Sequence, residues 1–523
     1  MSSFQQISAL SLAASLVGLS SLLPAAPFTA RSEEPAQDLS PSASALNTEA
    51  SSSTGLTRTE AIRLALTKNY ALRIEALSVP VARANLTEAR GLFDPRFKGS
   101  YSNSSADTPS LNAPLSPIAR SASSHYEADS SHAGLGGLLP WGLHYDLGVD
   151  SVREQGRHGF TQDVTTSYAG LTITQPLLRD AGFGPSLYGI RVARTNHAAS
   201  EWDYRQALTD TITQVLYACS ELEFQDALLR TARRSLELAT RLQDENRKRF
   251  AIGAISEFDV NSAEARVASR REGLIIAELG VKSATNELRR LISDLRTPEL
   301  LTQPLSLAPT QPPTVPAADA AADFHTALAL RPDFQKAALA IKRGTLDRDF
   351  ALNQLLPNVD LIASTGVNGF ATSWPAARSD LRSRDFKSSS AGISVSIPLS
   401  FTTERGRFRA ARLRREQAEF YLQKLEQDIL ISVGNAATTL DAARRRTETT
   451  ALARKLNDSL LEAELRRLRA GTGSTFSVLY QQEQLNYAEI SEALALHDLR
   501  RALAEYDRQT GRTLATHHIA LAN

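Results

Sequence analysis

Two long stretches of the chain carry apolar residues at alternating spacings of three and four, the pattern of helices in coiled-coil contact. The seam positions are Leu208, Ile212, Val215, Cys219 and Leu222, followed by Val260, Ala263, Val267, Leu274, Ala277, Val281, Ala284, Leu288 and Leu291. Only Arg270 interrupts the second seam. The segment from Pro185 to about Arg249 predicts one helix of roughly 65 residues and roughly 100 Å. Many seam positions are alanine, so neighbouring hairpins must supply part of the burial, which predicts an oligomeric tube.

Other segments alternate apolar with polar residues, which is typical of β-strands. Leu171 and Ile173, and later Ile393, Val395 and Ile397, stand two apart with Thr or Ser between them. Similar runs start at Phe97, Tyr101, Val359 and Leu361. A lipid-facing strand of a water-lined barrel shows this alternation, and so does a half-buried strand of a soluble sheet. The alternation by itself leaves both interpretations open.

The chain repeats its own plan in three ordered blocks, at shifts of 262, 222 and 218 residues. Residues 56–97 align with 318–359, 168–178 with 390–400, and 249–260 with 467–478. We therefore predict two copies, 56–300 and 318–511, each built of a helix, strands, a long helix, a short turn and a long helix. A Pro-rich linker, 301–317, joins the copies, and a tail follows over 512–523.

The N-terminal part predicts export. The first 30 residues carry no charge, and an apolar, Ser-rich run from Ile7 to Leu23 is followed by small residues. This predicts a signal peptide over 1–30, cleaved within Ala25 to Ala30, although the usual basic start is missing. A disordered N-terminus is the alternative. Residues 31–55 predict a flexible, disordered linker.

Composition narrows the function. The 523 residues hold 58 Lys and Arg against 57 Asp and Glu, a net charge of +1, which argues against a nucleic-acid partner. The single cysteine, Cys219, excludes an internal disulfide and any multi-thiolate metal site. Walker, zincin and nucleophile-elbow motifs are absent from the sequence. We therefore expect no enzyme activity, no cofactor and no metal site.

The ordered motifs resemble those of TolC-like outer-membrane channels of Gram-negative efflux pumps and type I secretion, the outer membrane factors. The motifs are ALTKNYAL, DPRF, LPNVD, TQPLL, SIPLSF, AIGAISEFDV and RAGTGSTFSV, and the resemblance covers roughly 56–510. It implies a mixed α and β fold, with long coiled-coil hairpins and a few strands. It also implies a homotrimer in which four strands per chain build one shared transmembrane β-barrel in outer-membrane lipid, above a periplasmic helical tunnel. The implied partners are a periplasmic adaptor protein and an inner-membrane pump of RND or ABC type.

The first copy carries about 40 extra residues, within Tyr101 to Thr166. Each copy enters the sheet from the helical side and returns to it, so it must cross an even number of times. The extra segment is then either an extracellular loop or loop-hairpin, or two further barrel strands. The interpretation favoured here is the loop or loop-hairpin.

The two helix-to-helix turns, Gly253 to Asp259 and Gly471 to Ser477, are the candidate working site. The resemblance places them at the tunnel tip, where they contact the adaptor. The adaptor-contacting candidates are Gly253, Ala254, Ser256, Gly471, Thr472, Gly473 and Ser474. Glycine suits a helix C-terminus and serine an N-cap, so ordinary tight turns explain the same residues.

The gate candidates are Asp259, Glu257, Ser477 and Tyr480. Threefold repetition of Asp259 and Glu257 creates a carboxylate ring, while the spacing of Ser256 and Asp259 also predicts a helix cap. Ser477 and Tyr480 stand where the family often carries an aspartate pair, so Tyr480 is expected to narrow the pore by bulk instead.

Two other functions compete with a general export channel. One is a structural periplasmic coiled-coil protein with a β-domain and no conduit. Outward strand positions that stay apolar over about 25 Å would argue against it. The other is a heavy-metal cation exporter, which the single Met disfavours.

Overall fold

The structure is a computed structural model. It describes residues 55–109, 123–157, 161–253, 255–294, 296–302, 305–308, 311, 313–316, 319–470 and 472–519. These residues belong to one compact unit, Pro41–Asn523. The predicted signal peptide, 1–30, and linker residues 31–54 lie outside the described part of the chain.

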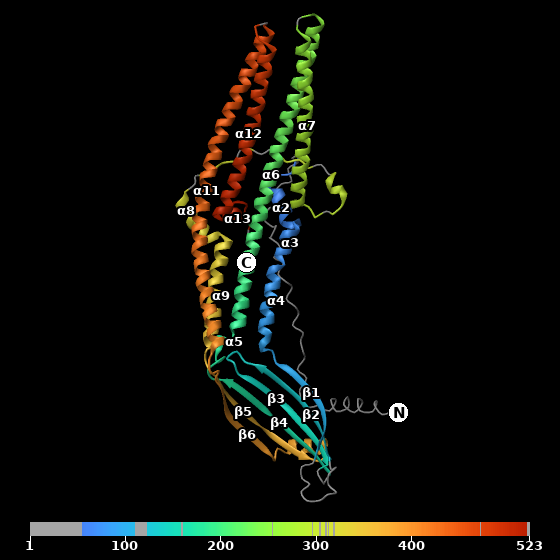
Figure 1. Ribbon diagram of the computed structural model, residues 1–523, viewed down its shortest axis with the longest axis vertical. Coiled ribbons are helices and arrows are strands. Elements are labelled where there is room, and N and C mark those ends of the chain that lie inside the picture. Colours follow the sequence, from blue (N-terminus) through green and yellow to red (C-terminus); the bar gives the residue numbers. More distant parts are fainter. Residues whose placement is uncertain are drawn as a thin grey trace, which may run out of the picture. The chain divides into compact units, whose positions relative to one another are not determined.

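Six strands form one antiparallel sheet in sequence order, as Figure 1 shows. They are β1 (Arg96–Pro109), β2 (Ser123–Leu138), β3 (His144–Arg157), β4 (Thr161–Pro176), β5 (Asn358–Ala371) and β6 (Lys387–Ser396). The first copy supplies four strands and the second two. The expectation of four strands per chain, with a loop or loop-hairpin in the extra segment, was therefore wrong.

The extra segment forms full strands because its apolar residues pair in register with the apolar residues of the neighbouring strands. Leu135 of β2 lies opposite Phe97 of β1 and Leu147 of β3, and Leu147 lies opposite Leu171 of β4. The turn between β2 and β3 is tight: Leu139 donates to the Leu143 carbonyl at 2.8 Å. Gly142 sits there at φ 94°, a left-handed conformation that favours glycine.

The sheet has one apolar and one polar face, because alternate side chains point to opposite sides. The apolar face carries Phe97, Leu135, Leu147, Leu171, Leu361 and Ile393, which are between 36% and 70% exposed. On the polar face, His132 Nδ1 lies 2.7 Å from Asp150 Oδ1, and the hydroxyls of Ser364 and Ser390 are 2.8 Å apart. A large apolar surface thus stays uncovered by the chain itself.

The helices follow the predicted repeat. The first copy holds α2 (Arg58–Lys68), α3 (Tyr70–Ala76), α4 (Ser78–Arg90), α5 (Phe183–Ser186), α6 (Tyr188–Ala251) and α7 (Glu257–Ile292), with 3-10 turns η3 (Gly91–Phe93) and η4 (Pro298–Leu301). The second holds α8 (Ala320–Leu330), α9 (Pro332–Asn353), α10 (Trp374–Ser383), α11 (Thr402–Arg469), α12 (Thr475–Thr510) and α13 (Thr513–Thr516). Equivalent helices match in length: α2 and α8 have 11 residues each, and α7 and α12 have 36 each.

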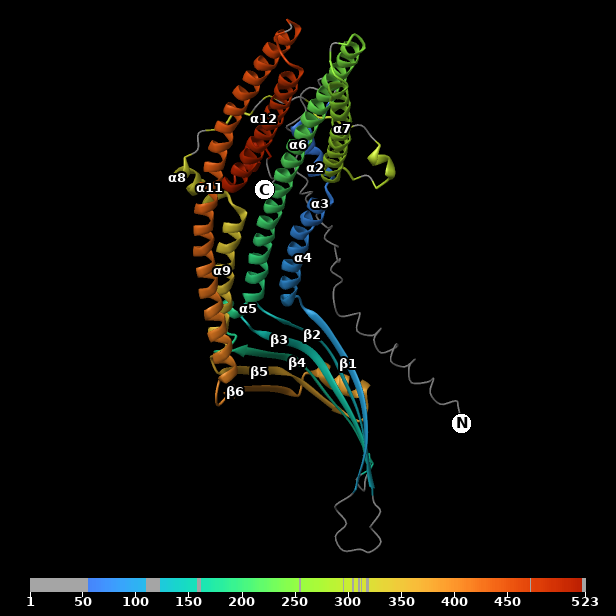
Figure 2. The ribbon, with the colours of Figure 1, turned by 45° about the horizontal axis from the view of Figure 1, so that its top comes forward.

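The long helices pair as two antiparallel hairpins, α6 with α7 and α11 with α12 (Figures 1 and 2). All five seam residues of α6 are buried, and so are the seam residues Ala263, Val267, Ala277, Ala284, Leu288 and Leu291 of α7. Their main cluster also takes in Ala61, Ile62 and Ala65 of α2. The predicted seams are therefore correct.

The linker and the tail both contribute to packing. Leu307 of the Pro-rich linker forms a parallel bridge with Leu56, and Leu514 and Ile519 of the tail pack against the main cluster. Among the described residues, no helix combines the length and apolar content needed to cross a membrane.

Candidate functional site

The first hairpin tip is built by complementary caps. Gly253 follows the last turn of α6 at φ 73° and donates its N–H to the Phe250 carbonyl at 2.8 Å. Ser256 caps α7: its Oγ accepts from the Asp259 N–H, while Asp259 Oδ2 accepts from the Ser256 N–H at 3.2 Å and hydroxyl at 2.7 Å. The predicted cap by Ser256 and Asp259 is confirmed. Glu257 is exposed in the first turn.

The second tip has the same kind of turn and serine cap, with fewer charged residues. Thr472 and Gly473 donate their N–H groups to the Arg467 carbonyl at 3.0 and 3.1 Å. Ser474 caps α12 by accepting from the Ser477 N–H at 3.1 Å, and the two serine hydroxyls are 2.7 Å apart. A Cβ on Gly473 would lie 2.8 Å from the Leu468 nitrogen, so this position requires glycine. The predicted tip residues Ala254 and Gly471 lie outside the described part of the chain.

Large apolar side chains project from both tips. Phe258 is 76% exposed and Phe476 is 77% exposed, at equivalent positions of the two copies. Ile252 and Tyr480 are exposed nearby, at 79% and 58%. Sequence reasoning missed the two phenylalanines, although their recurrence directly after the capped turn is a readable signal. Such exposed apolar groups are typical of a contact surface.

Ion pairs fasten the two hairpins to each other below the tips. Glu483 of α12 contacts Arg270 of α7, and it also lies 3.4 Å from Arg266 Nη1. Arg234 of α6 adds contacts to Glu489 of α12 at 2.8 Å and Asp458 of α11 at 3.8 Å. We call the group Arg266, Arg270 and Glu483 the clasp. Sequence reasoning missed Glu483, but the charged residue Arg270 inside an apolar seam was its signal.

A shallow groove lies between the hairpins at the same level. It is lined by Thr231, Arg234, Ser235, Leu238, Ala239, Arg266, Arg270, Leu461, Gln482, Leu485, Asn486 and Glu489. Its three arginines already pair with Glu489 and Glu483 of α12, so the groove favours contact between the hairpins rather than a charged ligand.

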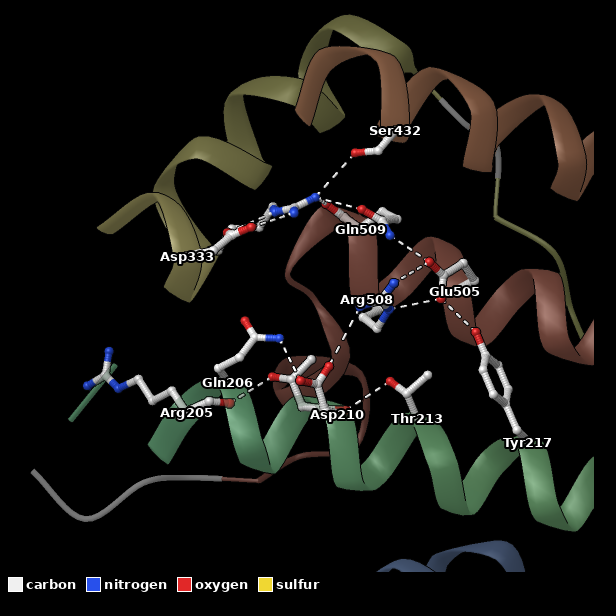
Figure 3. A network of polar contacts seen from close by, with 12 residues as sticks. Arg205, Gln206, Asp210, Thr213, Tyr217, Asp333, Ser432, Glu505, Arg508 and Gln509 are labelled. Carbon is white, nitrogen blue, oxygen red and sulfur yellow. Dashed lines mark hydrogen bonds and ion pairs between the residues drawn. The ribbon is translucent and has the colours of Figure 1, made fainter. Parts of the chain in front are cut away.

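Figure 3 shows a second polar network, nearer the middle of the long helices. Glu505 of α12 accepts from the Tyr217 hydroxyl of α6 at 2.6 Å and from Arg508 at 2.7 Å. Arg508 also lies 3.6 Å from Asp210 of α6. Burial alone would raise the pKa of Glu505, but hydrogen bonds from Arg508, Tyr217 and Gln509 outweigh it and lower the pKa to about 2. Glu505 therefore stays ionised and ties the two copies together.

A buried charge triad reinforces this junction. Glu223 of α6 pairs with Arg58 of α2 at 2.7 Å and contacts Arg500 of α12. Burial, and then the nearby Arg58, lower the pKa of Arg500 to about 10. Removing one partner of such a buried set leaves the others uncompensated, at a cost of about 3–5 kcal/mol. The middle of the helices is thus a fixed frame, whereas the tips are joined by fewer contacts.

Nothing in the described residues suggests catalysis or metal chemistry. Within these ranges, no group of three or more His, Cys, Asp and Glu side chains could hold a metal ion. Cys219 is buried, and burial raises the pKa of its thiol to about 11, against the opposing effect of Arg58. A thiol in this state is a poor nucleophile.

The chain matches a family model described as outer membrane efflux protein, over residues 61–293 and 324–512. The chain belongs to the outer membrane efflux protein family. The two matched ranges coincide with the two copies of the repeat. Membership confirms an outer-membrane export channel with a periplasmic helical part, and not an enzyme.

Solved structures show the same fold. The CmeC outer membrane channel of Campylobacter jejuni is 17% identical, with a TM-score of 0.66, and the match covers 87% of this chain and 86% of that one. VceC of Vibrio cholerae is 16% identical, with a TM-score of 0.63 and coverage of 87% and 96%. The open state of MtrE of Neisseria gonorrhoeae is 17% identical, with a TM-score of 0.63 and coverage of 87% and 89%. No curated protein sequence matches the chain.

Proposed function

We propose that this efflux-family channel works as a homotrimer whose sheets close into one wall around a shared pore. The supporting observation is the incomplete sheet. Within the described residues, β1 and β6 each pair on one side only, and the chain leaves the apolar face uncovered except at the end next to α10. Unpaired edges and uncovered apolar faces are costly for a lone subunit in water. Pairing β6 of one copy with β1 of the next removes the edges, and lipid covers the apolar face.

The helices support the same assembly. Apolar side chains that the chain does not cover recur along both hairpins: Ile275, Ile276, Leu279, Phe420, Leu430, Ile431, Leu452, Leu456 and Leu460. A second and third copy would bury them. A structural coiled-coil protein without a conduit does not explain why one sheet face is apolar while the other carries Ser, His and Asp.

The tips then serve as the gate and as the docking surface. In the proposed trimer, three tip pairs converge, with the carboxylates of Asp259 and Glu257 and the bulk of Tyr480 near the axis. The clasp between α7 and α12 holds the hairpins in the closed arrangement. A periplasmic adaptor, with an inner-membrane pump of RND or ABC type behind it, would engage the exposed Ile252, Phe258 and Phe476 and so open the passage for small molecules or polypeptides.

The assembly is tested with protein purified in detergent. We expect a mass of three chains in light scattering and stepwise ion conductance in planar bilayers. A monomer that remains dispersed without detergent and conducts nothing would reject the proposal. Paired cysteines placed at successive positions of β6 and β1 test the pairing directly, because a disulfide between these two edge strands can form only between neighbouring copies.

A further inference from the structure

Helix α10 lies on the apolar face of the sheet. A Cβ built on Gly369 of β5 would lie 2.3 Å from the Ala377 carbonyl and 3.3 Å from Leu381 Cγ, so the side-chain direction of Gly369 points at this helix. Gly369 alternates with Val367 and Leu361, which places it on the apolar face. Figure 2 shows α10 in orange beside the ends of the strands.

The helix sits at the level where the apolar face ends. Ser131, Ser151, Ser167 and Gly369 lie opposite one another in successive strands and form a row of small residues. The next rows toward the helical hairpins are apolar, with Ala133, Val149, Ala169 and Val367 and then Leu135, Leu147 and Leu171. The next row in the other direction is polar, with Asp129, Arg153 and Thr165. If lipid covers the apolar rows, α10 stands at the depth of the lipid headgroups.

The exposed residues of this segment suit that depth. Ala377 is fully buried against the sheet, while Arg382, Arg384 and Lys387 are exposed, and Trp374 is 36% exposed at the start of the helix. Arg378 adds a fourth cation, against the two carboxylates Asp380 and Asp385, and Asp380 already accepts the Phe370 N–H at 3.3 Å. An amphipathic helix with cations and tryptophan is typical of a membrane–water interface.

We propose that α10 and the segment up to Lys387 form a binding site for anionic lipid headgroups, whose phosphate carries an uncompensated negative charge. Arg382 and Arg384 offer hydrogen-bond donors to phosphate, and Lys387 reaches the headgroups along its apolar stem from the row of Val367. Trp374 anchors the helix at the same depth. This inference rests on the proposed trimer, because only that assembly turns the apolar face toward lipid.

The test uses the tryptophan fluorescence of reconstituted trimers. Trp141→Phe and Trp202→Phe leave Trp374 as the only reporter, since the chain has three tryptophans. We compare quenching by brominated phosphatidylglycerol, which is anionic, with quenching by brominated phosphatidylcholine, at equal mole fraction in nanodiscs. We expect about twofold stronger quenching by the anionic lipid, and loss of this preference in 0.5 M NaCl.

Matched variants separate the possible outcomes. The triple variant Arg382→Gln, Arg384→Gln and Lys387→Gln should make the quenching of Trp374 equal for the two lipids. Arg241→Gln with Lys248→Gln and Arg469→Gln, which removes the same charge near the hairpin tips, should preserve the preference. If the first triple variant still shows stronger quenching by the anionic lipid, the proposal is overturned. It is also overturned if Trp374 is not quenched at all, which would mean that another copy or water covers α10.

A reference probe distinguishes this failure from failure of the trimer. The probe is Leu171→Trp in a chain whose three native tryptophans, Trp374 included, are replaced. Position 171 lies in the apolar rows, so the fluorescence of this tryptophan should be quenched equally by both lipids. If this probe is quenched and the trimer conducts, while Trp374 shows no preference, only the headgroup site is rejected. If this probe is unquenched and no conductance is seen, the proposed assembly itself fails.

Discussion

Arg270 of α7 contacts Glu483 of α12, so the one charged residue in the first hairpin's apolar seam joins that hairpin to the second. Both side chains are about three-quarters buried in this contact. The pair lies between the fixed middle of the helices and the exposed tips. Any outward movement of one tip relative to the other must separate these two residues.

Glu483→Gln is therefore expected to favour the open channel. Loss of the charge weakens both the Arg270 and the Arg266 contact, by about 0.5–1 kcal/mol per protomer. Over three clasps in the proposed trimer, the ratio of open to closed channels should rise about tenfold or more. Single-channel recordings in planar bilayers measure this ratio directly.

The matched control is Glu492→Gln. Glu492 pairs with Arg454 at 2.6 Å within the α11–α12 hairpin and not between hairpins. Its loss should leave the open probability near that of the native channel. Equal effects of the two substitutions would show that the clasp has no special part in closure.

Local patterns predicted much of this molecule, and non-local pairing accounts for what was missed. The spacing from Leu208 to Leu222 gave the buried seam, and Ser256 with Asp259 gave the cap, because each depends on residues a few positions apart. The strands β2 and β3 were only the less favoured interpretation, because the Gly- and Ser-rich β2 and the charge-rich β3 have little strand character without the register to their neighbours. Glu483 was missed because its partner is over 200 residues away.

Asp259 allows the cap and the gate to be separated. Asp259→Ala removes the acceptor of two hydrogen bonds from Ser256 and should lower the stability of the first tip by about 1 kcal/mol. Asp259→Asn keeps an acceptor at this position but removes the charge. If the carboxylates form a ring at the pore, the Asn variant should lose cation selectivity, measured as the reversal potential in a KCl gradient.

Glu257→Gln is the companion variant, because Glu257 is exposed and takes no part in the cap. It should reduce selectivity to a similar extent without any loss of tip stability. An unchanged reversal potential in both charge variants would leave Asp259 as a helix cap alone.

Cys219 should be inert in the folded protein. It is buried in the main cluster, and the burial that raises the pKa of its thiol to about 11 leaves almost no thiolate at pH 7. We expect no maleimide labelling under native conditions and one label per chain in guanidinium chloride. Ala470→Cys, which places a thiol at an exposed hairpin end, should label rapidly in the folded state and serves as the control. Fast native labelling of Cys219 would mean that the helices around it open readily.

Asp507 of α12 should make stability depend on pH. Burial raises the pKa of its carboxyl from 3.8 to about 6, against the opposing effects of Arg512 and Thr516. Because the folded pKa is the higher one, the folded protein holds the proton more tightly. The contribution to stability is complete below the unfolded pKa and is lost as the pH rises through about 6. A shift of about two pKa units corresponds to no more than about 3 kcal/mol.

Asp507→Asn should remove this dependence, because the amide stays neutral at every pH. The native protein is expected to gain stability between pH 7 and pH 5 relative to the variant, measured as the difference in Tm by circular dichroism. The comparison cancels other groups that titrate in this range, such as His517, whose pKa is lowered by burial and by the charges of His518 and Arg58. Parallel curves for the two proteins would show that Asp507 is ionised without cost in the folded state, and that water or a neighbouring cation reaches it.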